Sequence, residues 1–197
     1  MHYLKQARGV NVLTDESKTL ERAQKGDEAA FEELLITYEK RIYNIAYRMM
    51  RNQSDAQDMA QEAIIKAYRN LHTFKGTCMF SSWVYRITVN TCLDEIRKRK
   101  KRNVLFMDAM DGEGAGFTDK APLPEQMMES KEEYARILSA INALNEEYKT
   151  VIVLRDMQGF SYRDISQIID CNIGTVKSRI NRARNILKTV LRQERNI

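Results

Sequence analysis

Apolar side chains recur at steps of three and four residues along most of the chain. Between Asp27 and Arg51 they are Phe31, Leu34, Leu35, Tyr38, Ile42, Ile45, Ala46 and Met49. This spacing puts them on one face of an α-helix, so it predicts a single helix over the segment. Asn52 and Gln53 interrupt the pattern, and we expect Ser54 to cap the next helix.

Two more helices are predicted before residue 103. The second runs from about Asp55 to His72, with an inward face of Met59, Ala63, Ile64, Ala67, Tyr68 and Leu71. After the loop TFKGTC, a third helix begins near Phe80 and continues to about Arg102, roughly 30 Å at the helical rise.

The last third of the chain has the same helical character. Ile137, Leu138, Ile141 and Leu144 predict one helix, and Tyr148, Val151, Ile152 and Arg155 predict another that ends at Gly159. No segment alternates long enough to predict a strand. We therefore expect an all-α fold with two small helical domains.

An acidic segment separates the two helical parts. The stretch from Asn103 to Gln126 holds both prolines of the chain, Pro122 and Pro124, and three of its eight glycines. From Asn103 to Glu133 there are eight acids and two bases, whereas both flanks are basic. This composition predicts a flexible, acidic linker.

The sequence from Ser161 onward predicts a helix-turn-helix. Ser161 and Asp164 have the spacing of a capping box. Ile165, Ile168 and Ile169 form a first inner face, the segment DCNIG interrupts it, and a second inner face follows with Ile173, Val176, Ile180, Ala183 and Leu187. Two short helices joined by such a turn are typical of DNA-binding proteins.

The second of these helices carries polar and basic residues on its outward face: Lys177, Ser178, Asn181, Arg182 and Arg184. Arg and Lys bind guanine edges or phosphates, Asn binds adenine, and Ser adapts to several partners. The alternative is an ordinary helical hairpin with a solvated basic face. The cap, the spacing and the Gly-Thr pair at the helix start favour DNA binding.

The third predicted helix ends in six consecutive bases, Arg97 to Arg102. Such a run suits a helix C-terminus and also attracts phosphates. The aromatic residues Phe74, Phe80, Trp83 and Tyr85 lie upstream. They predict either hydrophobic packing or a platform on which unpaired bases stack, and for Trp83 both interpretations stay open.

The second helix presents a different surface, formed by Asp55, Asp58, Gln61 and Glu62. Negative charge near a helix N-terminus is stabilising, which explains the two aspartates. It does not explain why the polar face continues through Gln61 and Glu62. Since phosphates would repel this face, we expect it to bind a protein.

Composition excludes several classes of function. The three cysteines, Cys78, Cys92 and Cys171, are scattered, so neither a metal site nor a disulfide framework is expected. The two histidines have no catalytic constellation around them, so we expect no enzyme and no cofactor. Apolar runs fall far short of the roughly 20 residues of a membrane span, and the start lacks a secretory h-region. We therefore expect a cytoplasmic protein that does not itself insert into membranes.

Together these segments resemble the extracytoplasmic-function sigma factors. The resemblance rests on GDEAAFEELLITYEKRIYNIAYRM for region 2.1, DAQDMAQEAIIKAYRNLHTF for region 2.2, FSSWVYRITVNTCLDEIRKRKKR for regions 2.3 and 2.4, and LNEEYKTVIVLRDMQGFSYRDISQIIDCNIGTVKSRINRAR for region 4. It implies an N-terminal extension (1–19), region 2 (20–102), a linker (103–129) and region 4 (130–197). Asn145 and Asn172 depart from the family, since many members have proline there.

The resemblance also implies partners and site residues. Core RNA polymerase would bind Asp55, Asp58, Gln61 and Glu62. The minus-ten promoter element would contact Phe74, Lys75, Phe80, Trp83, Asn90, Arg97, Lys98 and Lys101, with the loop 73–79 capturing a flipped-out base. The minus-thirty-five element would contact Lys177, Ser178, Asn181, Arg182 and Arg184. An anti-sigma factor would hold the protein inactive until a stress signal.

Two other functions compete with this interpretation. A stand-alone helix-turn-helix regulator would bind duplex DNA tightly without polymerase, and it would need neither the acidic face nor the aromatic and basic third helix. An enzyme would hydrolyse nucleotides or another substrate as the pure chain.

Overall fold

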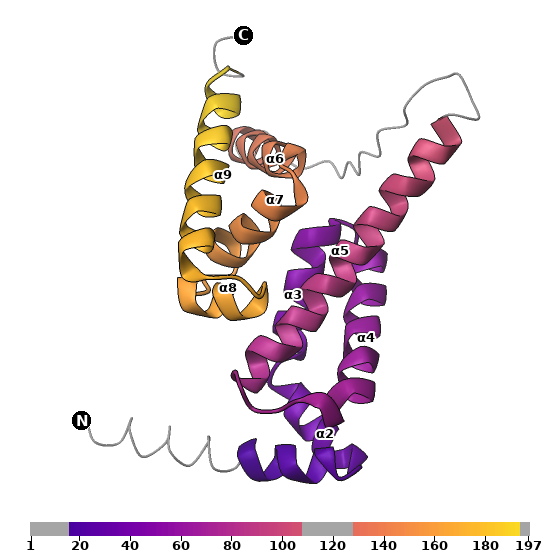
Figure 1. Cartoon of the computed structure of the whole chain (residues 1–197). Helices are drawn as coiled ribbons and strands as arrows, with labels where there is room; N and C mark the ends of the chain where they lie inside the picture. The colour runs from indigo at the N-terminus through magenta and orange to yellow at the C-terminus, as the bar shows by residue number, and fades with distance from the viewer. Residues whose placement is uncertain (1–15, 108–127, 194–197) are drawn as a thin grey trace. The chain divides into compact units, whose positions relative to one another are not determined.

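The computed structural model describes residues 16–107 and 128–193 (Figure 1). Within these ranges the chain forms helices and no strand, so the predicted all-α class is confirmed. The chain divides into two compact units, Met1–Thr91 and Cys92–Ile197, with the boundary inside a long helix. The predicted domain ranges of 20–102 and 130–197 stay predictions.

The first unit begins with a helix over residues 16–24, which includes four residues assigned above to the N-terminal extension. It continues with α2 (Glu28–Ile36), α3 (Glu39–Met50), α4 (Gln53–Asn70), the short 3-10 helix η1 (Leu71–Thr73) and the start of α5 (Phe80–Met107). In Figure 1 the lower part of α5 runs alongside α3 and α4.

The prediction of one helix over residues 27–51 was wrong, because the structure has two. Helix α2 ends in a tight turn in which the Tyr38 N–H donates to the Leu35 carbonyl at 2.8 Å. The Tyr38 ring packs edge-on against Phe80 and Tyr85, with centroids 5.8 and 6.1 Å apart. The apolar spacing continues across this break, so periodicity alone does not reveal it.

The packing of α3 on α4 depends on small side chains. Helix α4 buries four alanines at helical spacing: Ala56, Ala60, Ala63 and Ala67. Helix α3 buries Ile42, Ile45, Ala46 and Met49. A stripe without bulky side chains lets the two helices approach closely, and each large apolar side chain that is buried stabilises the unit by about 1.5 to 3 kcal/mol.

Two details of α4 differ from prediction. Its cap is Asn52 rather than Ser54, since Asn52 Oδ1 accepts from the Asp55 N–H at 3.0 Å. Tyr68 was predicted to face inward, but its side chain is exposed. Its ring packs on Phe31, and its hydroxyl donates to Glu28 at 3.0 Å. The polar hydroxyl gains more from this surface bond than from burial without a partner.

The second unit contains α6 (Met128–Ala143), α7 (Glu146–Ile152), the π-helical segment η3 (Val153–Met157), α8 (Tyr162–Ile168) and α9 (Ile173–Gln193). Its apolar cluster joins three of these helices through Ile141, Leu144, Ile152 and Ala183, with Ile137, Tyr148 and Leu187 packed against them. Gly159, at the predicted helix end, adopts the left-handed conformation with φ at 74°. That conformation favours glycine, so it ends the helical segment before α8.

The predicted linker coincides only in part with the gap between helices. Helix α5 continues to Met107 and α6 begins at Met128, so both ends of the predicted linker are helical. The remainder, residues 108–127, lies outside the described residues.

Candidate functional site

Both helices of the predicted helix-turn-helix begin at a side-chain cap. Ser161 Oγ accepts from the Asp164 N–H, and Asp164 Oδ2 accepts from the Ser161 N–H, each at 3.1 Å. This is the predicted capping box. Asn172 Oδ1 accepts from the Thr175 N–H at 2.8 Å at the start of α9. The caps satisfy backbone donors that helix starts leave without partners, so they fix where each helix begins.

The two departures from the family's proline positions have the same physical role. Asn145 Oδ1 accepts from the Tyr148 N–H at 2.9 Å and caps α7, as Asn172 caps α9. Proline pre-sets the backbone angle at a helix start, whereas asparagine supplies a hydrogen-bond acceptor there. Both devices begin a helix, so the departures preserve the fold.

The outward face of α9 exposes all five predicted reading residues to solvent, and the first four of them are Lys177, Ser178, Asn181 and Arg182. The Ser178 hydroxyl donates to the Thr175 carbonyl at 2.9 Å, which leaves its oxygen available to accept. The face therefore offers two cationic groups, an amide and a hydroxyl acceptor within two turns. These are the groups that bind base edges and phosphates in a major groove.

Arg184, the fifth predicted reading residue, is engaged in an ion pair. Its Nε lies 3.2 Å from Asp156 Oδ2, and its Nη2 contacts the other oxygen of the same carboxylate. The hydrogen bond to Asp156 raises the pKa of Arg184 above its ordinary value. Arg179 is also paired, with Nη2 2.9 Å from Glu147 Oε2. These two arginines tie α9 to η3 and α7.

Ile173 was predicted on the inner face of α9, and this was wrong. Its side chain is 41% exposed, whereas Val176 and Ile180 on the same helix are buried. Ile173 is the first residue of α9 and precedes the turn of the helix that packs on α8, so its side chain stays exposed. The N-terminal turn of a recognition helix is the part that meets base edges, so the residue belongs to the candidate DNA surface.

The basic end of α5 forms a continuous polar face. Asn90, Arg97, Lys98 and Lys101 are exposed, and steps of seven, eight and eleven residues from Asn90 put them on one side of the helix. Arg97 Nη1 lies 4.0 Å from Asp94 Oδ1 on the same side. Arg99 instead bonds Glu95 at 2.7 Å. The four predicted residues therefore lie on the same side of α5. Arg99 lies on the opposite side of the helix.

Three aromatic rings meet where the loop after η1 joins α5. Phe74 lies 5.6 Å from Phe80 and 5.4 Å from Trp83, and Phe80 lies 5.7 Å from Trp83, measured between ring centroids. Phe80 is only 3% exposed, while Phe74 and Trp83 are half-buried. The predicted DNA contact Phe80 therefore lies beneath the other two rings. Lys75 and the 58% exposed Met79 stand out from the same loop.

The acidic face of α4 includes an apolar residue. Asp58 and Gln61 are exposed, and Glu62 forms an ion pair with Lys66 at 3.5 Å. Asp55 is half-buried in the first turn. Ile65, one turn beyond Gln61 and Glu62, is 37% exposed on the same side. A partly exposed apolar group among polar ones is typical of a protein interface centre.

Sequence reasoning missed Ile65 and also Gln24. Ile65 lies outside the inward face that the spacing predicts for this helix and one turn beyond Gln61 on the polar side; that was an available signal. Gln24 contacts residues 47 and 50 positions away, and no local pattern announces such a contact.

Two kinds of feature are not found in the part of the chain that the structure describes. No helix there has both the length and the apolar character needed to cross a membrane. Nor do the described side chains include a group of three or more His, Cys, Asp or Glu residues placed to bind a metal ion.

Comparison with known families identifies both helical parts. Residues 34–102 match the family described as Sigma-70 region 2, and residues 134–187 match the family described as Sigma-70, region 4. These ranges contain every predicted site residue.

Similar proteins extend the match to nearly the whole chain. The RNA polymerase sigma-H factor of Pseudomonas aeruginosa is 38% identical, covering 91% of this chain and 96% of that protein. The ECF RNA polymerase sigma factor SigW of Bacillus subtilis is 37% identical, covering 89% and 96%. The solved sigma factor RpoE of Bartonella quintana, in complex with the anti-sigma factor NepR, is 26% identical with a TM-score of 0.60, covering 82% of this chain and 96% of that one.

Proposed function

Since the chain belongs to the extracytoplasmic-function sigma factors of the sigma-70 family, we propose which of its surfaces carries each step of transcription initiation. The proposal assigns polymerase binding to α4, promoter melting to the loop after η1 with the outward face of α5, and upstream promoter recognition to α9. The domains are those predicted above: region 2 over 20–102, a linker over 103–129 and region 4 over 130–197.

Core RNA polymerase binds the face formed by Asp55, Asp58, Gln61, Glu62 and, in addition, Ile65. The carboxylates select a basic partner and steer its approach, while the apolar group supplies contact area once water is expelled. The exposure of Ile65 beside Asp58 and Gln61 supports this assignment.

The minus-ten element binds the loop 73–79 and the face of α5 that holds Asn90, Arg97, Lys98 and Lys101. The bases of α5 attract the phosphates of the separated strand. Phe74 and Trp83 offer ring faces to an unstacked base, and this stacking offsets an unstacking cost of a few kcal/mol. Phe80, being buried, supports these two rings from below.

The minus-thirty-five element binds the exposed face of α9. Lys177, Ser178, Asn181 and Arg182 enter the major groove, and Ile173 at the first turn offers an apolar contact for a thymine methyl group. Arg184 holds α9 against η3 through Asp156 rather than reading a base, which the two-point ion pair supports.

Regulation follows the pattern of a solved relative. The Bartonella quintana sigma factor was solved in complex with an anti-sigma factor. We extend this to the present chain and propose that an anti-sigma factor holds it inactive until a stress signal. The protein acts in the cytoplasm, where polymerase and DNA are, and it is a binding subunit rather than an enzyme.

The observation that carries this assignment is the acidic face of α4 with Ile65 at its side, which a stand-alone helix-turn-helix regulator does not need. Fluorescence anisotropy of labelled duplex promoter fragments tests it. We expect a stable, chain-dependent complex when core RNA polymerase and the chain are both added, and weak binding with the chain alone. Tight binding by the chain alone, unchanged by polymerase, would support the regulator instead.

A further inference from the structure

Gln24, in the helix over residues 16–24, bonds the segment that leads into the melting loop. Its Nε2 donates to the Leu71 carbonyl at 3.3 Å and to the Phe74 carbonyl at 2.9 Å. Both acceptors are backbone groups, one in η1 and one at the first aromatic residue of the loop. We propose that Gln24 is a positioning residue for promoter melting that holds the loop ready to receive a base. This inference rests on the melting role proposed above for the loop.

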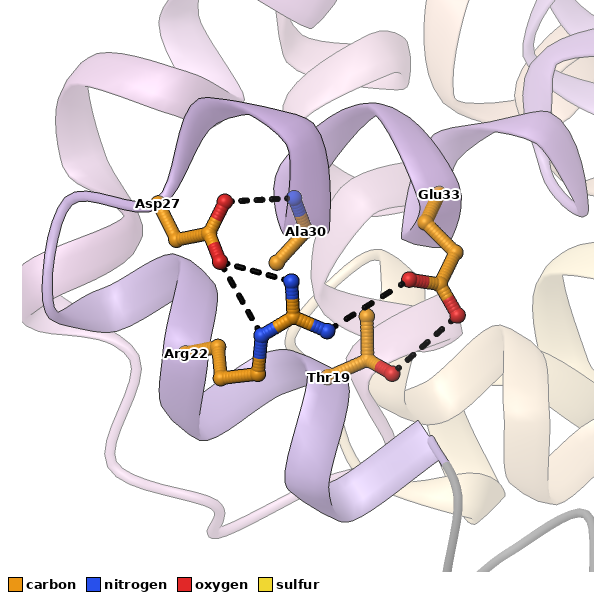
Figure 2. A network of polar contacts seen from close by, with 5 residues as sticks. All are labelled: Thr19, Arg22, Asp27, Ala30 and Glu33. Carbon is orange, nitrogen blue, oxygen red and sulfur yellow. Dashed lines mark hydrogen bonds and ion pairs between the residues drawn. The ribbon is translucent and has the colours of Figure 1, made fainter.

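The helix that carries Gln24 is itself fixed to α2, as Figure 2 shows. Arg22 donates to Asp27 Oδ2 from Nε at 3.0 Å and from Nη2 at 2.7 Å, and its Nη1 lies 3.8 Å from Glu33 Oε2. The Thr19 hydroxyl donates to Glu33 Oε1 at 3.4 Å. Asp27 Oδ1 in turn accepts from the Ala30 N–H at 3.1 Å. These contacts set the rotation of the helix and so the direction in which Gln24 points.

The same helix also reaches the far end of the loop. The Tyr38 hydroxyl donates to Glu16 Oε1 at 2.8 Å, and the Tyr38 ring packs against Phe80. Phe80 begins α5 directly after the loop. Residues 16–24 thus bond the start of the loop directly through Gln24, and they are linked to its end indirectly, through Tyr38, which packs on Phe80.

These contacts matter because the centre of the loop, at Gly76, has open space around it. Gly76 adopts φ of 70°, and apart from its two neighbours in the chain no residue lies within 4 Å of the place where its Cβ would be. Without such support, the loop would lose conformational entropy when it binds the base, and this cost would weaken the binding of the base. The two hydrogen bonds from Gln24 already fix the start of the loop, so less conformational entropy is lost when the base binds.

The test uses the full chain with core RNA polymerase on two forms of one promoter fragment. The first form is a complete duplex, and the second carries non-complementary bases across the downstream part of the minus-ten element, so that it is already open. Gln24→Met removes the donor and keeps the length of the side chain. Gln193→Met makes the same exchange at an exposed glutamine at the C-terminal end of α9, three turns beyond Arg182, and serves as the matched control.

We expect Gln24→Met to lower transcription from the duplex by about five- to tenfold, the effect of losing a hydrogen bond or two. Transcription from the open fragment should be nearly unchanged, as should transcription from both fragments with Gln193→Met. Equal losses on both fragments, a loss of polymerase binding, or no loss at all would each overturn the role of Gln24.

A third variant separates this inference from the function on which it rests. Phe74→Ala alters the loop directly and should also lower duplex transcription selectively. If Phe74→Ala affects both fragments alike, the loop does not act in melting and the proposed function fails there. If Phe74→Ala is selective and Gln24→Met is not, only the positioning role of Gln24 is wrong.

Discussion

The guanidinium of Arg184 spans both carboxylate oxygens of Asp156, which joins the recognition helix α9 to the π-helical segment η3. From sequence, Arg184 was one of five residues expected to read DNA. The pairing supports the proposed role of Arg184 in holding α9, because a cation that already contacts a carboxylate must give up that contact to bind a phosphate. π-helical segments within helices often accompany functional sites, and here the segment supplies the aspartate that orients α9.

A double-mutant cycle tests this role. Arg184→Ala and Asp156→Ala should each weaken binding to the upstream element to a similar degree, and the double variant should be no worse than either, since both single changes remove one interaction. Binding isotherms of the polymerase complex over a range of salt concentrations measure the effect. If Arg184 instead contacts a phosphate, its removal alone would reduce the salt slope by about 1, and Asp156→Ala would not imitate it.

Charge reversal separates the two partner surfaces. Glu62→Lys should weaken binding to core RNA polymerase, because it places a cation in the acidic face that the partner is expected to match. Arg182→Ala should leave polymerase binding intact and cost about 1 to 3 kcal/mol at the upstream element. Polymerase titrations and promoter binding, measured separately for both variants, give the comparison. Loss of the same activity in both would show that the surfaces are wrongly assigned.

Ile65 tests the apolar contribution to polymerase binding. Because its side chain is 37% exposed, Ile65→Ser should change the stability of the free chain little. It should weaken polymerase binding by about 1 to 2 kcal/mol if the group becomes buried in the complex. The exposed Ile36 on α2 provides the control, since Ile36→Ser removes a similar group away from α4. Equal effects at both positions would contradict a specific role for Ile65.

The Asp27 network should make stability depend on pH. The Ala30 N–H and then the Arg22 guanidinium hold the pKa of Asp27 below its ordinary value of 3.8. A carboxyl with a lowered pKa stabilises the folded state above the unfolded value and loses that contribution as pH falls through the folded value. Asp27→Ala should therefore unfold at lower urea concentration than the natural sequence at pH 7, and the difference should narrow below pH 3.8. A difference independent of pH would mean that the charge of Asp27 has no part in it.

Some structural features depend only on residues close together in the sequence, and two of these were predicted correctly. The capping box of Ser161 and Asp164 depends on residues three apart, and the structure contains it. The helical class followed from apolar spacing. The break at Tyr38 was missed because it depends on Phe80 and Tyr85, which lie more than forty positions further along the chain.

Surface assignments were limited for a related reason. Outward direction on a helix can be calculated from spacing, which is why Lys177 and Asn181 were placed correctly on the exposed side. Whether an outward cation is available depends on its neighbours from other elements. Asp156 was not visible as a partner of Arg184 at a separation of 28 residues, nor was the burial of Phe80 beneath Phe74 and Trp83.

The central claim is that this chain directs RNA polymerase to particular promoters. It is tested most directly by mapping transcript starts after mixing the purified chain, core RNA polymerase and genomic DNA of the host. We predict starts that depend on the chain, share paired upstream elements, and disappear when Glu62→Lys replaces the natural sequence. Unchanged starts, with the chain alone protecting duplex sites, would contradict the claim.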